Sequence, residues 1–191
     1  MNSMNRYALG AMAALLALPL LPAPAGAQEG DCVEEGNRNT RGADVALSYA
    51  GRRDDTRSEE YRYNEALDKL QENWAEGEAL PRSYLLAAKS YLGLRDLAGA
   101  DSMLTKLVET VPECAEQAQR LRFNAWVPLY NAGIEKMRAG DPAAALQSFQ
   151  SANVINKDAR SLAYAGSIQQ QQGNNERAAE LYEMALETGG E

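Results

Sequence analysis

A spacing of 33 residues relates two stretches in the C-terminal half of the chain. The first stretch contains Gly133, Gly140, Ala145, Phe149 and Ala152, which recur as Gly166, Gly173, Ala178, Tyr182 and Ala185. A period of roughly 20 to 50 residues indicates an array of small supersecondary units, and a period of about 34 is typical of stacked helical hairpins. The repeat therefore predicts an all-α array, and strand patterns are absent from the sequence.

Composition and charge exclude several classes of function. The chain has 191 residues, of which 45% are hydrophobic and 24% charged, which fits one globular domain. The formal net charge of -8 disfavours a nucleic-acid partner, since phosphates require a basic face. There is no histidine, the commonest general base and metal ligand, and two cysteines cannot complete a zinc or iron-sulfur site. We therefore expect no metal, no cofactor and no enzymatic activity.

Residues 1–27 have the layout of a cleavable signal peptide. Arg6 precedes an apolar run over 7–21, and the segment ends in Ala-Gly-Ala at 25–27. The run is shorter than the roughly 20 residues that a membrane-spanning helix needs. We expect cleavage after Ala27, export to the periplasm or exterior of a bacterium, and only transient contact with the membrane. An uncleaved membrane anchor is the alternative.

Export changes how the two cysteines are interpreted. In an oxidising compartment an even pair favours a disulfide, and a bond from Cys32 to Cys114 would attach the N-terminal tail to the array. Two free thiols are the alternative, because spacing alone does not show that the cysteines come within reach.

The remaining chain divides into a tail and a helical domain. Glycine and asparagine break any helical period over 28–42, so we expect a flexible polar tail there. Residues 43–191 form the predicted repeat domain, with units at about 44–80, 81–112, 113–157 and 158–191.

One unit is longer than the period requires. Between Pro112 and Trp126 there are about 11 extra residues, and 11 residues make about three helical turns, so the helix can lengthen without losing its apolar phase. We expect a long helix that is kinked or divided at Pro128 and projects beyond the array as a dimerisation or docking element.

The residues that return at this period resemble the tetratricopeptide repeat, and the chain is similar to exported bacterial members of that family. In 81–112 the matching positions are Tyr84, Ala87, Ala88, Tyr91, Ala100, Leu104, Leu107 and Pro112. From Trp126 they are Leu129, Ala132, Gly133, Ala145, Phe149 and Ala152, and in the last unit Leu162, Ala165, Gly166, Ala178, Tyr182 and Ala185. The resemblance implies a right-handed α-solenoid of antiparallel helix hairpins, with three good units and one degenerate first unit. An unrelated helical bundle is the competing interpretation.

The resemblance also implies a concave groove lined by the first helix of each hairpin. Its groove positions fall on Arg82, Leu85, Lys89, Leu92, Val127, Tyr130, Asn131, Ile134, Arg138, Arg160, Ser167, Gln170 and Gln171. Many of these side chains are basic, aromatic or amide-bearing, so the groove would favour an acidic segment or a C-terminal carboxylate. An ordinary solvated helix surface is the alternative for each position.

These observations predict a non-catalytic protein–protein interaction scaffold in the bacterial cell envelope, which binds a partner segment in the groove. A second hypothesis is self-assembly, because the last helix presents Leu181, Tyr182 and Ala185 without a polar capping helix after it. A third is an accessory subunit of an envelope enzyme complex.

Overall fold

The computed structural model describes residues 31–75 and 80–189, and this part contains eight α-helices and one short 3-10 turn. The predicted signal peptide at 1–27 and the first residues of the predicted tail lie outside the described residues. The first four helices are α1 (Arg38–Tyr49), α2 (Glu59–Ala75), α3 (Pro81–Gly93) and α4 (Leu97–Thr110). The 3-10 turn η1 (Pro112–Cys114) leads into α5 (Ala115–Arg138), α6 (Pro142–Ile155), α7 (Ala159–Gln171) and α8 (Asn175–Gly189).

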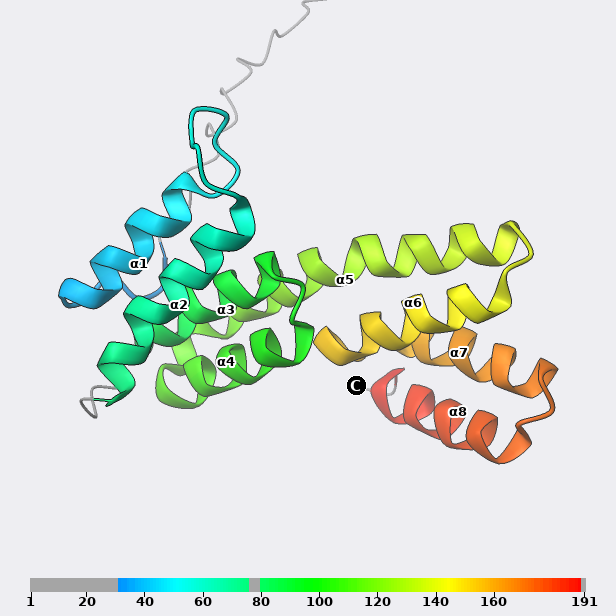
Figure 1. The fold of residues 1–191 in the computed structure, drawn as a ribbon. Coiled ribbons are helices and arrows are strands. Elements are labelled where there is room, and N and C mark those ends of the chain that lie inside the picture. Colours follow the sequence, from blue (N-terminus) through cyan, green and yellow to red (C-terminus); the bar gives the residue numbers. More distant parts are fainter. Residues whose placement is uncertain (1–30, 76–79, 190–191) are drawn as a thin grey trace, which may run out of the picture. The chain divides into compact units, whose positions relative to one another are not determined.

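The helices pair in chain order into four hairpins, which are α1 with α2, α3 with α4, α5 with α6, and α7 with α8 (Figure 1). Successive hairpins pack through α2 against α3, α4 against α6, and α6 against α7. Each hairpin therefore contacts its neighbours in sequence, as the repeat predicted. The described part of the chain is all-α, and the predicted fold class, an α-solenoid of helix hairpins, is confirmed.

Close contact between a glycine and an aromatic ring explains the 33-residue repeat. A Cβ atom added at Gly133 would lie 2.6 Å from the Phe149 ring, and one added at Gly166 would lie 2.9 Å from the Tyr182 ring. Both distances are shorter than side chains tolerate, so only glycine lets the ring of the second helix lie directly on the backbone of the first. The same contact thus recurs in the third and fourth hairpins.

The turns inside the last three hairpins share one backbone geometry. Gly140 and Gly173 have φ values of +77° and +85°, and Arg95 holds the same place in the α3–α4 turn with a φ of +60°. In all three turns the residue that follows donates its amide to a helix carbonyl at 2.9 Å. Arg95 therefore occupies a position where the backbone conformation favours glycine.

The second helices of these hairpins begin as their sequence signals predict. The side chains of Asp96 and Asp141 accept from the amides of Gly99 and Ala144, each at 2.9 Å, and so cap α4 and α6. Pro142 takes the first helical position of α6, where its missing amide hydrogen is not needed.

The first helix begins earlier than the sequence indicated. The predicted tail extended to Gly42, but α1 starts at Arg38 because the Asn37 side chain accepts from the amides of Asn39 and Thr40 at 3.0 and 3.1 Å. Gly42 is accommodated inside the helix, next to the aliphatic stem of Lys69. The tail interpretation is therefore wrong for residues 38–42.

The predicted projecting helix is also corrected. One continuous helix, α5, runs over 24 residues with Pro128 inside it, so the predicted division does not occur. Its first half does not project from the array, because Ala118 is fully buried in a cluster with Ala88 of α3 and Leu104 of α4. The additional turns extend the packing of the second hairpin into the third (Figure 1).

Candidate partner-binding groove

The predicted groove positions fall into two halves that differ in what covers them. We call the positions on α3 the α3 half, which comprises Arg82, Leu85, Lys89 and Leu92. The positions on α5 and α7 form the α5–α7 half. In the α3 half no position is exposed, whereas Asn131, Arg138, Arg160, Gln170 and Gln171 are exposed in the α5–α7 half. Val127, Tyr130, Ile134 and Ser167 are half-buried there.

A segment of the same chain lies on the α3 half. Residues 31–36, which we call the N-terminal segment, precede α1. The ammonium of Lys89 donates to the Asp31 carboxylate at 2.7 Å, and the guanidinium of Arg82 donates to the Val33 carbonyl at 2.7 Å. Arg82 also donates to Asp44 of α1 through Nε at 3.1 Å. The cations of the α3 half are therefore already paired with groups of the chain itself.

A disulfide holds this segment in place. Cys32 is bonded to Cys114, with the two Cα atoms 5.4 Å apart. The Cys32 amide donates to the Gln117 side chain at 2.8 Å, and the Gln117 amide group donates to the Asp31 carboxylate at 3.0 Å. The structure thus shows the bonded state, which is one of the two states that the sequence left open.

Opposing effects act on the Asp31 carboxyl. Burial acts to raise its pKa, but hydrogen bonds from Lys89 and Gln117 and the charge of Arg82 outweigh burial, so the pKa lies below its ordinary value of 3.8. Asp31 is therefore a carboxylate at neutral pH and is bound as an anion by three side chains.

One groove prediction on α3 requires correction. Leu85 is fully buried in a cluster with Leu107 and Cys114, against which Cys32 and Val33 pack, so it presents no surface to a partner. Leu85 is covered because segments distant in sequence fold over it. Leu92 is half-buried and packs against the cluster that contains Trp126, as Val127 and Tyr130 do.

An aromatic row underlies the α5–α7 half. Phe123, Trp126 and Tyr130 follow one face of α5, with ring centroids 5.6 and 4.7 Å apart in sequence order. Tyr164 of α7 continues the row at 6.1 Å from Tyr130. Trp126 is almost fully buried, whereas Phe123 at the end of the row is 48% exposed.

Arg160 lies on this row and places a cation at the surface. Its guanidinium carbon is 5.0 Å from the Trp126 ring centroid and 5.4 Å from that of Tyr130. Both carboxylate oxygens of Asp158 accept from it at 3.0 Å, which raises the pKa of Arg160, and the side chain is still 60% exposed. Burial raises the pKa of Tyr130, so its phenol stays neutral. Arg160 is thus a fixed cation that a partner can reach.

The repeat spacing in the sequence predicted Arg160 and Tyr130 as groove residues but did not predict the aromatic row. Phe123, Trp126 and Tyr130 are spaced by three and four residues, which places them on one helix face. That spacing was present in the sequence, and the predicted break near Pro128 obscured it.

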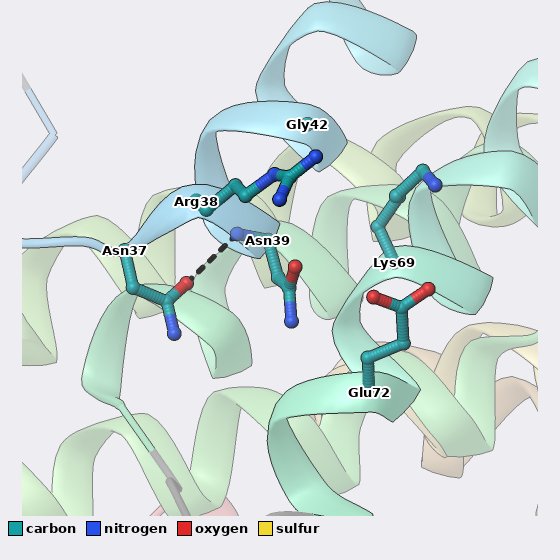
Figure 2. Close-up of a pocket in the computed structure, with 6 residues that line it drawn as sticks. All are labelled: Asn37, Arg38, Asn39, Gly42, Lys69 and Glu72. Atoms are coloured by element: carbon teal, nitrogen blue, oxygen red, sulfur yellow. Dashed lines mark hydrogen bonds between the residues drawn. The ribbon is translucent and has the colours of Figure 1, made fainter.

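The structure also forms a hollow of about 650 Å³ that was not predicted (Figure 2). It lies between the start of α1 and α2 and is lined by Asn37, Arg38, Asn39, Gly42, Lys69 and Glu72. The Asn37 side chain faces the amide of Asn39, as the dashed line in Figure 2 shows. The residues that line the hollow are a mixture of amides and side chains of opposite charge.

Within residues 31–75 and 80–189, no group of three histidine, cysteine or acidic side chains is placed to hold a metal ion. The chemistry that the groove offers is recognition by cations, amides and aromatic rings.

None of the helices in the described part of the chain combines the length and the apolar character that crossing a bilayer requires.

Comparisons with known proteins found similarity to solved structures. No family model matches the chain, and no curated protein sequence matches it. A structure described as MamA MSR-1 C2 is 15% identical, with a TM-score of 0.33, and the match covers 80% of this chain and 97% of that chain. A second, described as MamA AMB-1 C2221, is 16% identical, with a TM-score of 0.31, and the match covers 79% and 98%. The helix pairing and the repeated glycine–aromatic contacts of this chain itself define its α-solenoid fold.

Proposed function

We propose that this chain is a non-catalytic interaction scaffold of the bacterial cell envelope, and that its α5–α7 half binds an acidic segment of a partner protein. The observation that carries the proposal is the occupied α3 half. There the first-helix surface holds an extended segment by pairing a carboxylate with Lys89 and a backbone carbonyl with Arg82. Because the first-helix surface of the α3 half binds an extended acidic segment, we expect the neighbouring α5–α7 half to bind such a segment as well.

The α5–α7 half offers matching groups in an accessible position. Arg138 is the last residue of α5 and Arg160 lies in the first turn of α7, and both side chains are exposed. Asn131 of α5 and Gln170 and Gln171 of α7 add exposed amides that can donate to backbone carbonyls or accept from backbone amides. A partner with acidic side chains and an extended backbone fits this set.

The proposed location follows from the N-terminus and the disulfide. The signal-peptide layout of 1–27 predicts export, and a disulfide such as Cys32–Cys114 persists in oxidising compartments such as the bacterial periplasm. Both features support an exported protein.

Replacement of the two exposed arginines tests the proposed function. Arg138→Glu/Arg160→Glu reverses two charges in the α5–α7 half, and Arg53→Glu/Arg177→Glu reverses two exposed charges elsewhere as a matched control. In a pull-down from envelope extract, we expect the groove variant to lose at least nine tenths of the captured partner and the control to retain it. Equal capture by both variants would refute the proposal. Arg82 and Lys89 are left unchanged, because their replacement would also release the N-terminal segment.

Self-assembly is a second candidate, which one observation favours. Leu186 of α8 is 77% exposed, the highest value among the large apolar side chains that the structure describes as exposed. An apolar side chain of this kind can be covered by a second copy. Light scattering of residues 28–191 would show a dimer that Leu186→Glu converts to a monomer, and a monomeric wild type would exclude this candidate.

A further inference from the structure

The N-terminal segment contacts the groove as a bound peptide would. Asp31 supplies a carboxylate to Lys89 and Gln117, and Val33 supplies a backbone carbonyl to Arg82. Its own backbone also donates, through the Cys32 amide to Gln117. These bonds join residues 49 to 86 positions apart in the chain, so they are tertiary contacts that need α3 and α5 in their folded places.

The bound carboxylate occupies a site built from two elements. Lys89 comes from α3 and Gln117 from α5, and the Arg82 guanidinium lies 3.9 Å from the other carboxylate oxygen of Asp31. The Lys89 and Arg82 side chains are 32% and 17% exposed while the segment is in place. Without the segment, the Lys89 ammonium and the Gln117 amide would face solvent, next to Arg82, which would keep its ion pair with Asp44 of α1.

The disulfide is a second covalent link of this segment, which the backbone already joins to α1. Cys32 lies between the two groups that bind, Asp31 and Val33, and its sulfur joins Cys114 at the start of α5. A tether at this point keeps the segment beside the site at a high effective concentration, so a separate peptide competes poorly.

We propose that the N-terminal segment is an intramolecular ligand of the α3 half, and that reduction of the Cys32–Cys114 disulfide opens this half to an acidic segment of a partner. This inference rests on the proposed function, because it extends partner binding from the α5–α7 half to the rest of the groove. With the disulfide formed, a partner can bind only the α5–α7 half. With the disulfide reduced, a partner can bind both halves of the groove.

The reduction requires a dithiol reductant. One thiolate of the reductant attacks Sγ of Cys32, which is less buried than Cys114, and a mixed disulfide forms as Cys114 leaves as a thiolate and takes up a proton. The second thiol of the reductant then attacks the mixed disulfide and releases Cys32 as a thiol. Two electrons pass to the protein, and the reductant becomes a disulfide.

A labelled peptide reports the opening directly. The probe is fluorescein-labelled Gly-Asp-Ser-Val-Glu-Glu-Gly, which copies residues 30–36 with serine in place of cysteine. The proteins are the oxidised wild type, the wild type in dithiothreitol, and an Asp31→Asn/Cys32→Ser variant that has lost both the tether and the competing carboxylate. By fluorescence anisotropy we expect the variant to bind the probe at least tenfold more tightly than the oxidised wild type, with the reduced wild type between them.

Two controls tie the binding to the carboxylate site. A probe with asparagine in place of aspartate should bind the variant at least tenfold more weakly, and so should the original probe when Lys89→Gln is added to the variant. Equal binding to the oxidised and untethered proteins, or binding that ignores either control, would overturn the inference. Circular dichroism is recorded for each protein to show that helix content is retained.

Hydrogen exchange on the wild type provides a test without substitutions. Reduction should remove protection at the Cys32 amide, which donates to Gln117, while α4 stays protected. Retained protection in the reduced protein would show that the segment stays bound without the disulfide and would overturn the inference. Both measurements report the α3 half alone, so their failure is distinct from failure of the Arg138 and Arg160 test.

Discussion

At the scale of single residues, the 33-residue repeat depends on glycine positions where an aromatic ring leaves no space for a side chain. Gly133 lies inside α5, where alanine would ordinarily favour the helix by about 1 kcal/mol. The Phe149 ring occupies the space that a Cβ would need, so packing outweighs helix propensity at this position.

Substitution at Gly133 should therefore destabilise the protein. We expect Gly133→Ala to lower the free energy of unfolding by about 1 to 3 kcal/mol, because Phe149 must shift. Urea denaturation measures the change. Gly42→Ala is the matched control inside α1, where the nearest atoms belong to the flexible Lys69 stem, and we expect it to be neutral or stabilising by up to about 1 kcal/mol. Equal effects of the two substitutions would contradict this explanation.

Substitution of the turn residue Arg95 by glycine should stabilise the protein, in contrast to substitution of Gly133 by alanine. Its φ of +60° costs a residue with a Cβ about 1 kcal/mol, which glycine avoids. Arg95→Gly should therefore raise the free energy of unfolding by about 0.5 to 1 kcal/mol, measured by thermal or urea unfolding. Gly173→Ala is the reverse test, since nothing lies within 4 Å of its added Cβ, and it should destabilise by a similar amount through backbone strain alone.

The ion pair between Asp55 and Arg62 should make the free energy of unfolding depend on pH. Hydrogen bonds from Arg62 lower the pKa of Asp55 from 3.8 to about 2. A carboxyl whose pKa is lower in the folded state stabilises the protein above about pH 4 and loses this contribution as pH falls toward 2. The difference in unfolding free energy between wild type and Asp55→Asn should therefore be constant from pH 5 to 7 and shrink between about pH 4 and 2. A difference that stays constant to pH 2 would show that the pair does not contribute.

At the scale of elements, α5 connects the second hairpin to the third. Ala118 packs with α3 and α4, whereas Trp126 packs with Ala100 of α4 and with Ala152 and Ile155 of α6. One helix therefore contributes to two clusters, and this accounts for its 24 residues. The insertion that broke the period in the sequence is a packing element in the structure.

The aromatic residues of α5 should contribute unequally to the free energy of unfolding. Trp126 is 3% exposed, so Trp126→Ala should cost about 3 to 5 kcal/mol of unfolding free energy. Phe123 is 48% exposed, and Phe123→Ala should cost less than about 1.5 kcal/mol. Urea denaturation of both variants tests the order. If Phe123→Ala proved the more damaging, the exposed end of the row would be part of the core.

The 33-residue repeat predicted the hairpins of the C-terminal half, because its causes lie within one hairpin. The recurring glycines Gly133 and Gly166 contact a ring of the next helix, and Gly140 and Gly173 form the turn between the two helices. The start of α1 was missed because glycine and asparagine over 28–42 disfavour helix, and the packing of Ala43 and Ala46 against α2 and α3 outweighs that preference.

At the scale of the whole molecule, the candidate groove has one occupied and one open half. The spacing of the repeat predicted thirteen groove positions, but it could not show that Asp31 pairs with Lys89, 58 positions away, because such a contact depends on the tertiary fold. Leu85 was misplaced for the same reason, since the segment that buries it is remote in sequence. That the exposed side chains of α5 and α7 form the partner-binding site is still a prediction.

Site-specific photocrosslinking in the cells that make this protein tests the central claim most directly. A photoreactive amino acid replaces Asn131, which is exposed on α5 in the open half, or Gln147, which is exposed on α6 outside the groove. The account predicts that irradiation attaches a partner protein at position 131 and not at position 147. Attachment at 147 with none at 131, or equal attachment at both, would contradict it.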